Sequence, residues 1–203
     1  IDRSGSMSGR PMTDAKEAVN HFIEELRPSD RANLITFETR VSMSHEFSSD
    51  KSSLKSTVGS IQVGGATALY DAIARAASTL RQESGAKIIV FLTDGDDTGS
   101  KFSLTDLESM NLSEGIFVYG IGLGSVNTTS LDRLAKATDG TYYPVASSVD
   151  LYTIYDRVIN AYYKNYGKNL AKTASMTIRS LPSKMSVIID GKQKGKTPFK
   201  LDG

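Results

Sequence analysis

The chain begins with three oxygen-bearing side chains at alternate positions. Asp2, Ser4 and Ser6 directly follow the apolar residue Ile1, and Gly5 lets the backbone curve between them. A carboxylate and two hydroxyls on one loop are the kind of oxygen ligands that a hard cation such as Mg²⁺ takes. Taken alone, the triplet is better explained by helix capping or turn formation, for which Ser and Asp are common residues. A metal site would also need further ligands, because three do not fill an octahedron.

Two more side chains with oxygen atoms stand where other strands are expected to lead into helices. Thr67 follows a glycine-rich turn and precedes an apolar pattern at helical spacing over 68–82. Asp94 follows closely on the apolar run 88–92. In open α/β sheets, ligands bind in the crevice outside the carboxyl ends of the strands. Thr67 and Asp94 are therefore the candidates to complete a site with the first triplet, a combination that chance does not readily produce.

The apolar residues predict the elements that would hold these loops. Continuous β-branched and aromatic runs at 88–92 and 116–119 are typical of parallel strands buried on both faces. Shorter runs at 34–37 and 41–47 predict further strands. Apolar residues recur at helical spacing in four segments: 14–26, 69–80, 131–135 and 151–162. This order predicts an α/β fold with a doubly wound, mostly parallel sheet flanked by helices.

The candidate ligands lie in a pattern that resembles a known family. Asp2-Arg3-Ser4-Gly5-Ser6-Met7, Gly64-Gly65-Ala66-Thr67-Ala68-Leu69 and Leu92-Thr93-Asp94-Gly95 are similar in order and spacing to the von Willebrand factor A (VWA) domain, over about residues 1–166. The resemblance implies a metal-ion-dependent adhesion site (MIDAS) whose ligands are Asp2, Ser4, Ser6, Thr67 and Asp94. The expected ion is Mg²⁺, with Mn²⁺ or Ca²⁺ as alternatives, and the two carboxylates would balance its charge.

The resemblance also implies how such a site would work. In relatives, an acidic side chain of a partner protein is captured at the metal, so we expect a divalent-metal-dependent protein-binding module and not an enzyme. The central first strand of the family ends just before Asp2, so only Ile1 of it would be present. We therefore expect the natural protein to extend upstream of Ile1 and, from the pattern at its other end, beyond Gly203.

The last part of the chain has a different character. Residues 167–174 predict a linker, and 175–203 predict a small, incomplete all-β module with strands at 176–178 and 185–189 and a tight turn at Asp190-Gly191. This segment resembles the PEGA domain, a bacterial β-module, although only Pro182 matches the motif that names the family. Residues 164–203 hold nine basic and two acidic side chains, which we attribute to protection of strand edges and not to binding of an anionic polymer. The bacterial resemblance favours a place outside the cytoplasm, at the cell surface or in the periplasm.

Composition excludes several functions. The 203 residues contain no cysteine and carry a net charge of +1, and no apolar stretch approaches the ~20 residues of a membrane-spanning helix. Disulfides, zinc-thiolate sites and cysteine nucleophiles are excluded, and no nucleic-acid partner is expected. The two histidines, His21 and His45, are not placed to build a Ser-His-Asp triad.

A metal-dependent hydrolase or phosphoryl-transfer enzyme remains the alternative, with Asp96 and Asp97 as candidate bases. A purely structural scaffold segment is the third interpretation.

Three other patterns favour structural explanations. The glycines at 120, 122 and 124 lack the spacing of a dinucleotide-binding loop and predict a turn at the end of a strand. Asp96 and Asp97 predict a solvated loop in preference to a second cation site. The tyrosines of the last helical segment predict packing in the core.

Overall fold

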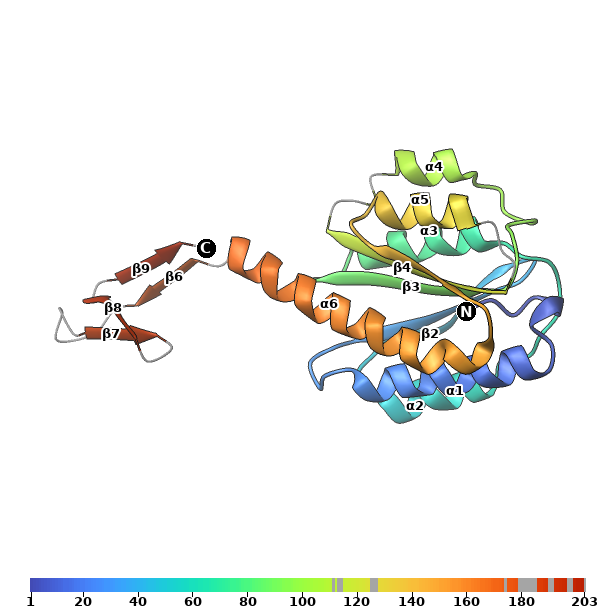
Figure 1. The fold of residues 1–203 in the computed structure, drawn as a ribbon, viewed down its shortest axis with the longest axis horizontal. Helices are drawn as coiled ribbons and strands as arrows, with labels where there is room; N and C mark the ends of the chain where they lie inside the picture. The colour runs from blue at the N-terminus through green and yellow to red at the C-terminus, as the bar shows by residue number, and fades with distance from the viewer. Residues whose placement is uncertain are drawn as a thin grey trace. The chain divides into compact units, whose positions relative to one another are not determined.

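The computed structural model describes residues 1–110, 112, 115–124, 128–173, 175–178, 186–189, 192–196 and 199–202. The chain forms two compact units, Ile1–Tyr162 and Tyr163–Gly203. The first unit contains a β-sheet between two layers of helices (Figure 1). The predicted α/β class is therefore confirmed.

Parallel strands form one part of the sheet. They are β3 (Lys87–Thr93), β4 (Ile116–Leu123) and β5 (Thr141–Val145), with β4 in the middle. The apolar runs of β3 and β4 are buried on both faces, as parallel strands covered by helices on each side require. The continuous apolar runs in the sequence predicted this arrangement, and it is confirmed.

An antiparallel hairpin forms the other part, and the first residues of the chain join the two. The hairpin consists of β1 (Ala32–Phe37) and β2 (Val41–Ser48). The Asp2 amide donates to the Leu92 carbonyl at 3.0 Å, while the Phe37 amide donates to the Ile1 carbonyl at 3.1 Å. Residues 1–3 therefore lie between β1 and β3, in a parallel bridge with β1. This position brings Asp2 to the carboxyl end of β3.

The helices cover the two faces of the sheet in two layers (Figure 1). One layer holds α1 (Arg10–Glu25), α2 (Lys51–Gly59) and α6 (Leu151–Thr173). The other holds α3 (Leu69–Leu80), α4 (Leu104–Ser109) and α5 (Thr128–Lys136). Two short 3₁₀ turns, η1 (Gly5–Met7) and η2 (Ser148–Asp150), lead into α1 and α6.

Each face of the sheet has its own apolar core. Along β4, Tyr119 and Ile121 pack with α1, α2 and α6, whereas Ile116 and Val118 pack with α3, α4 and α5. This division follows the alternation of side chains along a strand. Two opposed cores hold β3 and β4 firmly, and the loops at their carboxyl ends start from fixed points.

The structure contains elements that the sequence did not predict. Helices α2 and α4 are short and present few apolar residues, and each depends on a cap: Asp50 accepts from two amides of α2, and Ser103 forms a capping box with Asp106. Strand β5 includes Pro144, which has no amide hydrogen and is tolerated because, among the described strands, β5 pairs only with β4.

The prediction of a turn at the glycines of 120–124 is wrong in part. Gly120 and Gly122 lie inside β4, and only Gly124, with φ of 76°, follows it. Gly120 has a packing reason, because a Cβ atom there would lie 2.4 Å from Cζ of Phe91 on the neighbouring strand. The glycines make room for an aromatic ring and do not form a loop.

The second unit is described by itself. Strand β6 (Ser175–Ile178) pairs with β9 (Phe199–Asp202), and β7 (Ser186–Ile189) pairs with β8 (Lys192–Lys196), both antiparallel. The two predicted strands are thus present, while the predicted turn at Asp190-Gly191 lies outside the described residues. Helix α6 continues to Thr173, so helix occupies most of the segment predicted as a linker, 167–174. The domain boundaries themselves stay a prediction.

No helix in the described part of the chain combines the length and apolar character needed to cross a membrane.

Candidate metal centre

Three loops meet at the carboxyl end of β3. The first follows Asp2 and contains η1, and the third follows β3 and contains Asp94. The second leads from α2 to α3, so Thr67 does not follow a strand, contrary to expectation. Backbone hydrogen bonds bring this second loop to the first: the Gly64 amide donates to the Arg3 carbonyl at 2.8 Å, and the Gly5 amide donates to the Gly65 carbonyl at 3.1 Å.

Asp2 is fully buried, and both its carboxylate oxygens accept hydrogen bonds from the protein. Its Oδ1 accepts from the Ser4 amide at 2.8 Å, and its Oδ2 accepts from the Thr93 hydroxyl at 2.7 Å. A buried carboxylate is unfavourable unless donors or cations compensate it. Thr93 is such a donor, and it is not among the ligands predicted from the sequence. A polar side chain ending the apolar run of β3 was the signal that could have identified it.

A row of hydroxyls connects the first loop to the third. The Ser6 hydroxyl donates to Asp94 Oδ1 at 2.8 Å, and the Ser4 and Ser6 hydroxyl oxygens lie 3.0 Å apart. Because the single Ser6 proton points to Asp94, the proton between the two serines comes from Ser4. The structure thus brings Ser4, Ser6 and Asp94 together.

The pKa of Asp94 is raised above its ordinary value. Partial burial is the main cause, the nearby charge of Asp2 adds to it, and the hydrogen bond from Ser6 opposes it. The direction of this shift indicates that the charged form of Asp94 is less favourable here than in water, mainly because the carboxyl is partly buried and in smaller part because Asp2 is near.

Thr67 completes the group from the second loop. Its side chain is only 6% exposed. A Cβ atom placed on Gly95 would lie 3.8 Å from the Thr67 hydroxyl oxygen, so this hydroxyl faces the residue next to Asp94. All five predicted ligands therefore gather at one edge of the sheet, although their role in binding metal stays a prediction.

The chemistry of this group fits a divalent cation. Two carboxylates supply two negative charges, and three hydroxyls supply neutral oxygen atoms, as hard cations require. Among the described side chains, no Lys or Arg nitrogen forms an ion pair with Asp2 or Asp94. The described residues also contain no cluster of three or more His, Cys, Asp or Glu that could hold a metal elsewhere. The residues present therefore suit a metal held by two carboxylates and several hydroxyls.

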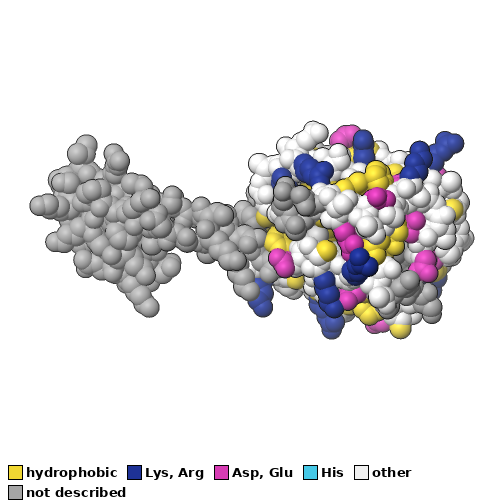
Figure 2. Space-filling model, turned by 90° about the horizontal axis from the view of Figure 1, so that it is seen from above, with side chains coloured by type: hydrophobic (Ala, Val, Ile, Leu, Met, Phe, Trp, Pro, Cys, Tyr) yellow, Lys and Arg dark blue, Asp and Glu magenta, His cyan; other side chains and the backbone are white. Residues whose placement is uncertain are grey.

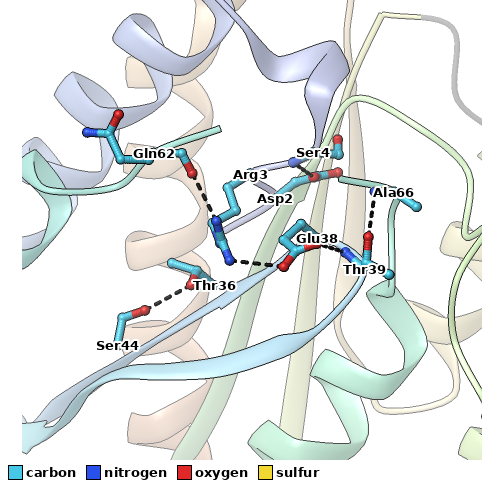
Figure 3. Close-up of polar contacts among 9 residues, drawn as sticks. All are labelled: Asp2, Arg3, Ser4, Thr36, Glu38, Thr39, Ser44, Gln62 and Ala66. Atoms are coloured by element: carbon cyan, nitrogen blue, oxygen red, sulfur yellow. Dashed lines mark hydrogen bonds and ion pairs between the residues drawn. The ribbon is translucent and has the colours of Figure 1, made fainter. Parts of the chain in front are cut away.

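Arg3 connects the first two loops beside Asp2 and Ser4 (Figure 3). Its guanidinium donates to the Gln62 carbonyl at 3.2 Å and forms an ion pair with Glu38 at 3.1 Å. The neighbouring Thr39 hydroxyl accepts from the Ala66 amide at 3.0 Å, next to Thr67. Gly65 is required beside this connection, because its φ is 83° and a Cβ atom would collide with the Glu38 carboxylate.

The other residues considered as candidates lie in structural roles. Asp97 is half-buried and accepts hydrogen bonds, so the prediction of a solvated loop is wrong for Asp97, whereas Asp96 is exposed. His21 pairs with Asp156, and His45 contacts the Glu46 carbonyl and the Ser53 hydroxyl. Neither histidine lies among the predicted metal ligands.

The tyrosines of α6 divide between core and surface. Tyr155 is buried as predicted, Tyr152 is exposed, and Tyr162 and Tyr163 are half-buried. The side chain of Tyr166 lies outside the described part.

Comparisons with known proteins agree with this architecture. The family model of the von Willebrand factor type A domain matches residues 1–157, and the PEGA domain model matches residues 173–203. The inter-alpha-trypsin inhibitor heavy chain H4 of Homo sapiens is 29% identical over 183 residues, which cover 79% of this chain and 20% of that protein. The chain thus spans about a fifth of the length of the curated relatives it matches.

Solved structures show the same fold. The von Willebrand factor type A protein from Catenulispora acidiphila superposes with a TM-score of 0.70 at 22% identity, covering 77% of this chain and 40% of that one. Proximal thread matrix protein 1 from the mussel byssus, solved with zinc in its MIDAS motif, superposes with a TM-score of 0.66 at 20% identity. That match covers 79% of this chain and 43% of the mussel protein.

Proposed function

Because the chain belongs to the von Willebrand factor type A domain family over residues 1–157, we propose that it is a divalent-metal-dependent protein-binding module. Domains of this family typically serve protein interaction and metal-dependent adhesion. In this chain the residues that would hold the metal are Asp2, Ser4, Ser6, Thr67 and Asp94.

The observation that carries the proposal is the convergence of these side chains from three loops. A hydrogen-bonded row runs from Ser4 through Ser6 to Asp94, beside the buried carboxylate of Asp2. The main-chain hydrogen bonds between the first two loops keep the oxygen atoms of these side chains close together. The zinc-containing MIDAS of the mussel protein supports a metal at the corresponding place. We propose Mg²⁺ as the ion, with Mn²⁺ or Ca²⁺ as alternatives.

We further propose that the partner presents an acidic side chain. The metal would supply a positive charge whose remaining coordination position accepts one more carboxylate. Asp2 and Asp94 already balance a divalent ion, so the site would not repel that carboxylate. On the face shown in Figure 2, acidic and basic side chains are interspersed and hydrophobic ones form only small patches. This face therefore lacks the broad basic surface that nucleic-acid binding favours.

A binding role is better supported than an enzymatic one. Both histidines are engaged with residues away from the three loops. Asp97, a candidate base, accepts hydrogen bonds from main-chain amides and a serine hydroxyl. We therefore propose a non-enzymatic module. The match of residues 173–203 to the bacterial PEGA module supports a bacterial protein associated with the cell surface or with secretion.

A metal titration tests the proposal. Mg²⁺ at about 100 times its Kd should stabilise the native protein by about 2.7 kcal/mol. For a chain of this size, that raises the melting temperature by about 5–10 °C. The Asp94→Ala variant should show no such increase, and the control Asp132→Ala, which removes a carboxylate from α5, should respond like the wild type. Identical responses of wild type and Asp94→Ala would exclude the site.

A second experiment tests the partner. Pull-down from a bacterial surface extract, with Mg²⁺ or with chelator, should recover a protein only in the presence of the metal. Capture that is unchanged by chelator would contradict metal-dependent binding.

A further inference from the structure

The third loop continues past Asp94 and folds back over the start of α3. Residues 97–102 of this loop contact the main chain of the second loop and the first turn of the helix. The loop that carries one predicted ligand thus also holds the segment that carries another. This arrangement suggests that the third loop does more than present Asp94.

The main chain of Thr67 is held at both its polar groups. Its amide donates to the Thr98 hydroxyl at 3.2 Å. Its carbonyl accepts from the Thr98 amide at 2.9 Å and from the Gly99 amide at 3.0 Å. Because Thr98 is four residues from Asp94, these bonds link the Thr67 backbone directly to the loop that starts at Asp94.

Asp97 adds a second connection at the first turn of α3. The helix begins after Ala68, whose side chain cannot cap it. Asp97 Oδ1 accepts from the Tyr70 amide at 3.1 Å and from the Ser100 hydroxyl at 2.5 Å. The Ser100 hydroxyl in turn accepts from the Asp71 amide at 3.0 Å. The cap that α3 lacks locally is therefore supplied by the third loop.

A side chain of α3 also binds the main chain of the third loop. The Asp71 carboxylate accepts from the Lys101 and Phe102 amides, each at 2.9 Å. Helix and loop therefore hold each other at several points. Any movement of the third loop relative to α3 would break several hydrogen bonds at once.

We propose that Asp97 and Thr98 are positioning residues of the metal centre, which hold the Thr67 hydroxyl at a fixed place relative to the Asp94 carboxylate. The inference rests on the proposed function, because it concerns the same site. Residues that orient metal ligands without touching the metal commonly affect its affinity 10–100-fold. Asp97 and Thr98 can act in this way because their contacts are with the main chain that carries the ligands.

Direct measurement of Mn²⁺ binding by electron paramagnetic resonance tests the inference on the whole chain. Asp97→Ala should bind Mn²⁺ about 10–100-fold more weakly than the wild type. Thr98→Val keeps the shape of the side chain and removes the hydroxyl, and should bind about tenfold more weakly. Thr98→Ser restores the hydroxyl and should bind like the wild type. Since the Thr98 side chain is exposed, neither of its variants should unfold the protein.

A matched control separates positioning from general stability. Ser103 caps α4 through its hydroxyl, just beyond this part of the loop. Ser103→Ala should lower the melting temperature in chelator and leave the Mn²⁺ affinity unchanged. A purely structural role for Asp97 and Thr98 would make their variants behave in the same way as Ser103→Ala.

The outcomes distinguish this inference from the proposed function. If wild type and Asp94→Ala bind Mn²⁺ equally, the proposed metal site fails and the inference with it. If Asp94→Ala loses binding while Asp97→Ala and Thr98→Val bind like the wild type, the positioning role alone is overturned. Equal losses in Thr98→Val and Thr98→Ser would likewise overturn the role of the hydroxyl.

Discussion

The Thr93 hydroxyl stabilises the buried negative charge of Asp2 at the centre of the predicted site. Its hydroxyl lies 2.7 Å from Asp2 Oδ2 and also contacts the main chain of Gly95. Both Thr93 and Asp2 are fully buried, so this hydrogen bond is shielded from bulk solvent. The hydroxyl therefore connects the Asp2 carboxylate to the main chain of the third loop.

Replacing Thr93 by Val should destabilise the protein. The change leaves one oxygen of Asp2 buried without its donor, which costs about 1–3 kcal/mol. The free energy of unfolding, measured in urea with chelator present, should fall by that amount. Thr93→Ser keeps the hydroxyl and should retain most of the stability. Equal stabilities of the Val and Ser variants would show that the hydrogen bond contributes little.

Glu38 should give the stability of the protein a dependence on acidic pH. The hydrogen bond from Thr39 is the main cause that holds the pKa of Glu38 below its usual 4.5, and the charge of Arg3 acts in the same direction. A carboxyl whose pKa is lower in the folded state stabilises the fold above its unfolded pKa, and this contribution is lost as the pH falls through the folded pKa. Glu38 therefore stabilises the protein at about pH 5 and above, and less at lower pH.

The variant Glu38→Gln cannot ionise and should show a flatter fall of melting temperature between about pH 5.5 and 3. Glu46→Gln, which removes the same charge from an exposed position of β2, should keep the wild-type dependence. If Glu38→Gln and the wild type have the same pH profile, the connection through Arg3 does not depend on the charge of Glu38.

At the residue scale, the sequence predicted the side chains that converge but not those that support them. Asp2, Ser4, Ser6, Thr67 and Asp94 belong to short motifs whose residue types carry the chemistry. Thr93 and Asp97 act through contacts that depend on how separate loops pack. The polar side chain that ends the apolar run of β3 marks Thr93, but no local pattern reveals that its partner is Asp2. Arg3 stands inside a motif, but its partner Glu38 is 35 residues away.

Among the elements, β4 shows how one glycine can fix the packing between neighbouring strands. Gly120 lies beside Phe91 of β3 in the parallel register, and the aromatic ring occupies the space where a side chain would stand. The ring belongs to the core shared with α3 and α5. Close packing in this core leaves the ring little room to move.

The variant Gly120→Ala should therefore be destabilised by about 1–3 kcal/mol, as overpacking of a core usually costs. The matched control is Gly59→Ala at the end of α2, where a Cβ atom meets nothing within 4 Å. Gly59→Ala should be neutral or slightly stabilising. Adding Phe91→Leu to Gly120→Ala makes space for the new methyl group. The free energy of unfolding of the double variant should therefore fall by less than the sum of the losses in the two single variants. Strict additivity in urea denaturation would contradict this packing.

Long periodic segments predicted their elements well, and short ones did not. The stripes of α1, α3 and α6 and the apolar runs of β3 and β4 are long enough to establish a period. Helices α2 and α4 have 9 and 6 residues and depend on the caps Asp50 and Ser103. Strand β5 contains Pro144, which argues against a strand unless the sheet order is known.

At the scale of the whole molecule, the sheet with its two cores explains why the predicted ligands can converge. The carboxyl ends of residues 1–3 and of β3 lie side by side because the Asp2 amide binds the Leu92 carbonyl. Helices on both faces leave the loops at this edge as the place where polar side chains gather. The two cores lie within the first unit, and among the side chains that the structure describes they extend no further along the chain than Tyr162.

The location of these cores allows a test of the domain organisation that we propose: a VWA domain over 1–166, a linker over 167–174 and a partial PEGA-like module over 175–203. A chain ending at Tyr166 keeps every described core residue and all five predicted ligands. It should melt cooperatively within about 2–4 °C of the full chain, since a loss of 1 kcal/mol shifts the melting temperature by that amount. Mg²⁺ should raise this temperature as much as in the full chain, because the predicted site lies wholly before residue 100. A shortened chain that melts without cooperativity, or that no longer responds to Mg²⁺, would show that residues 167–203 are part of the same folding unit.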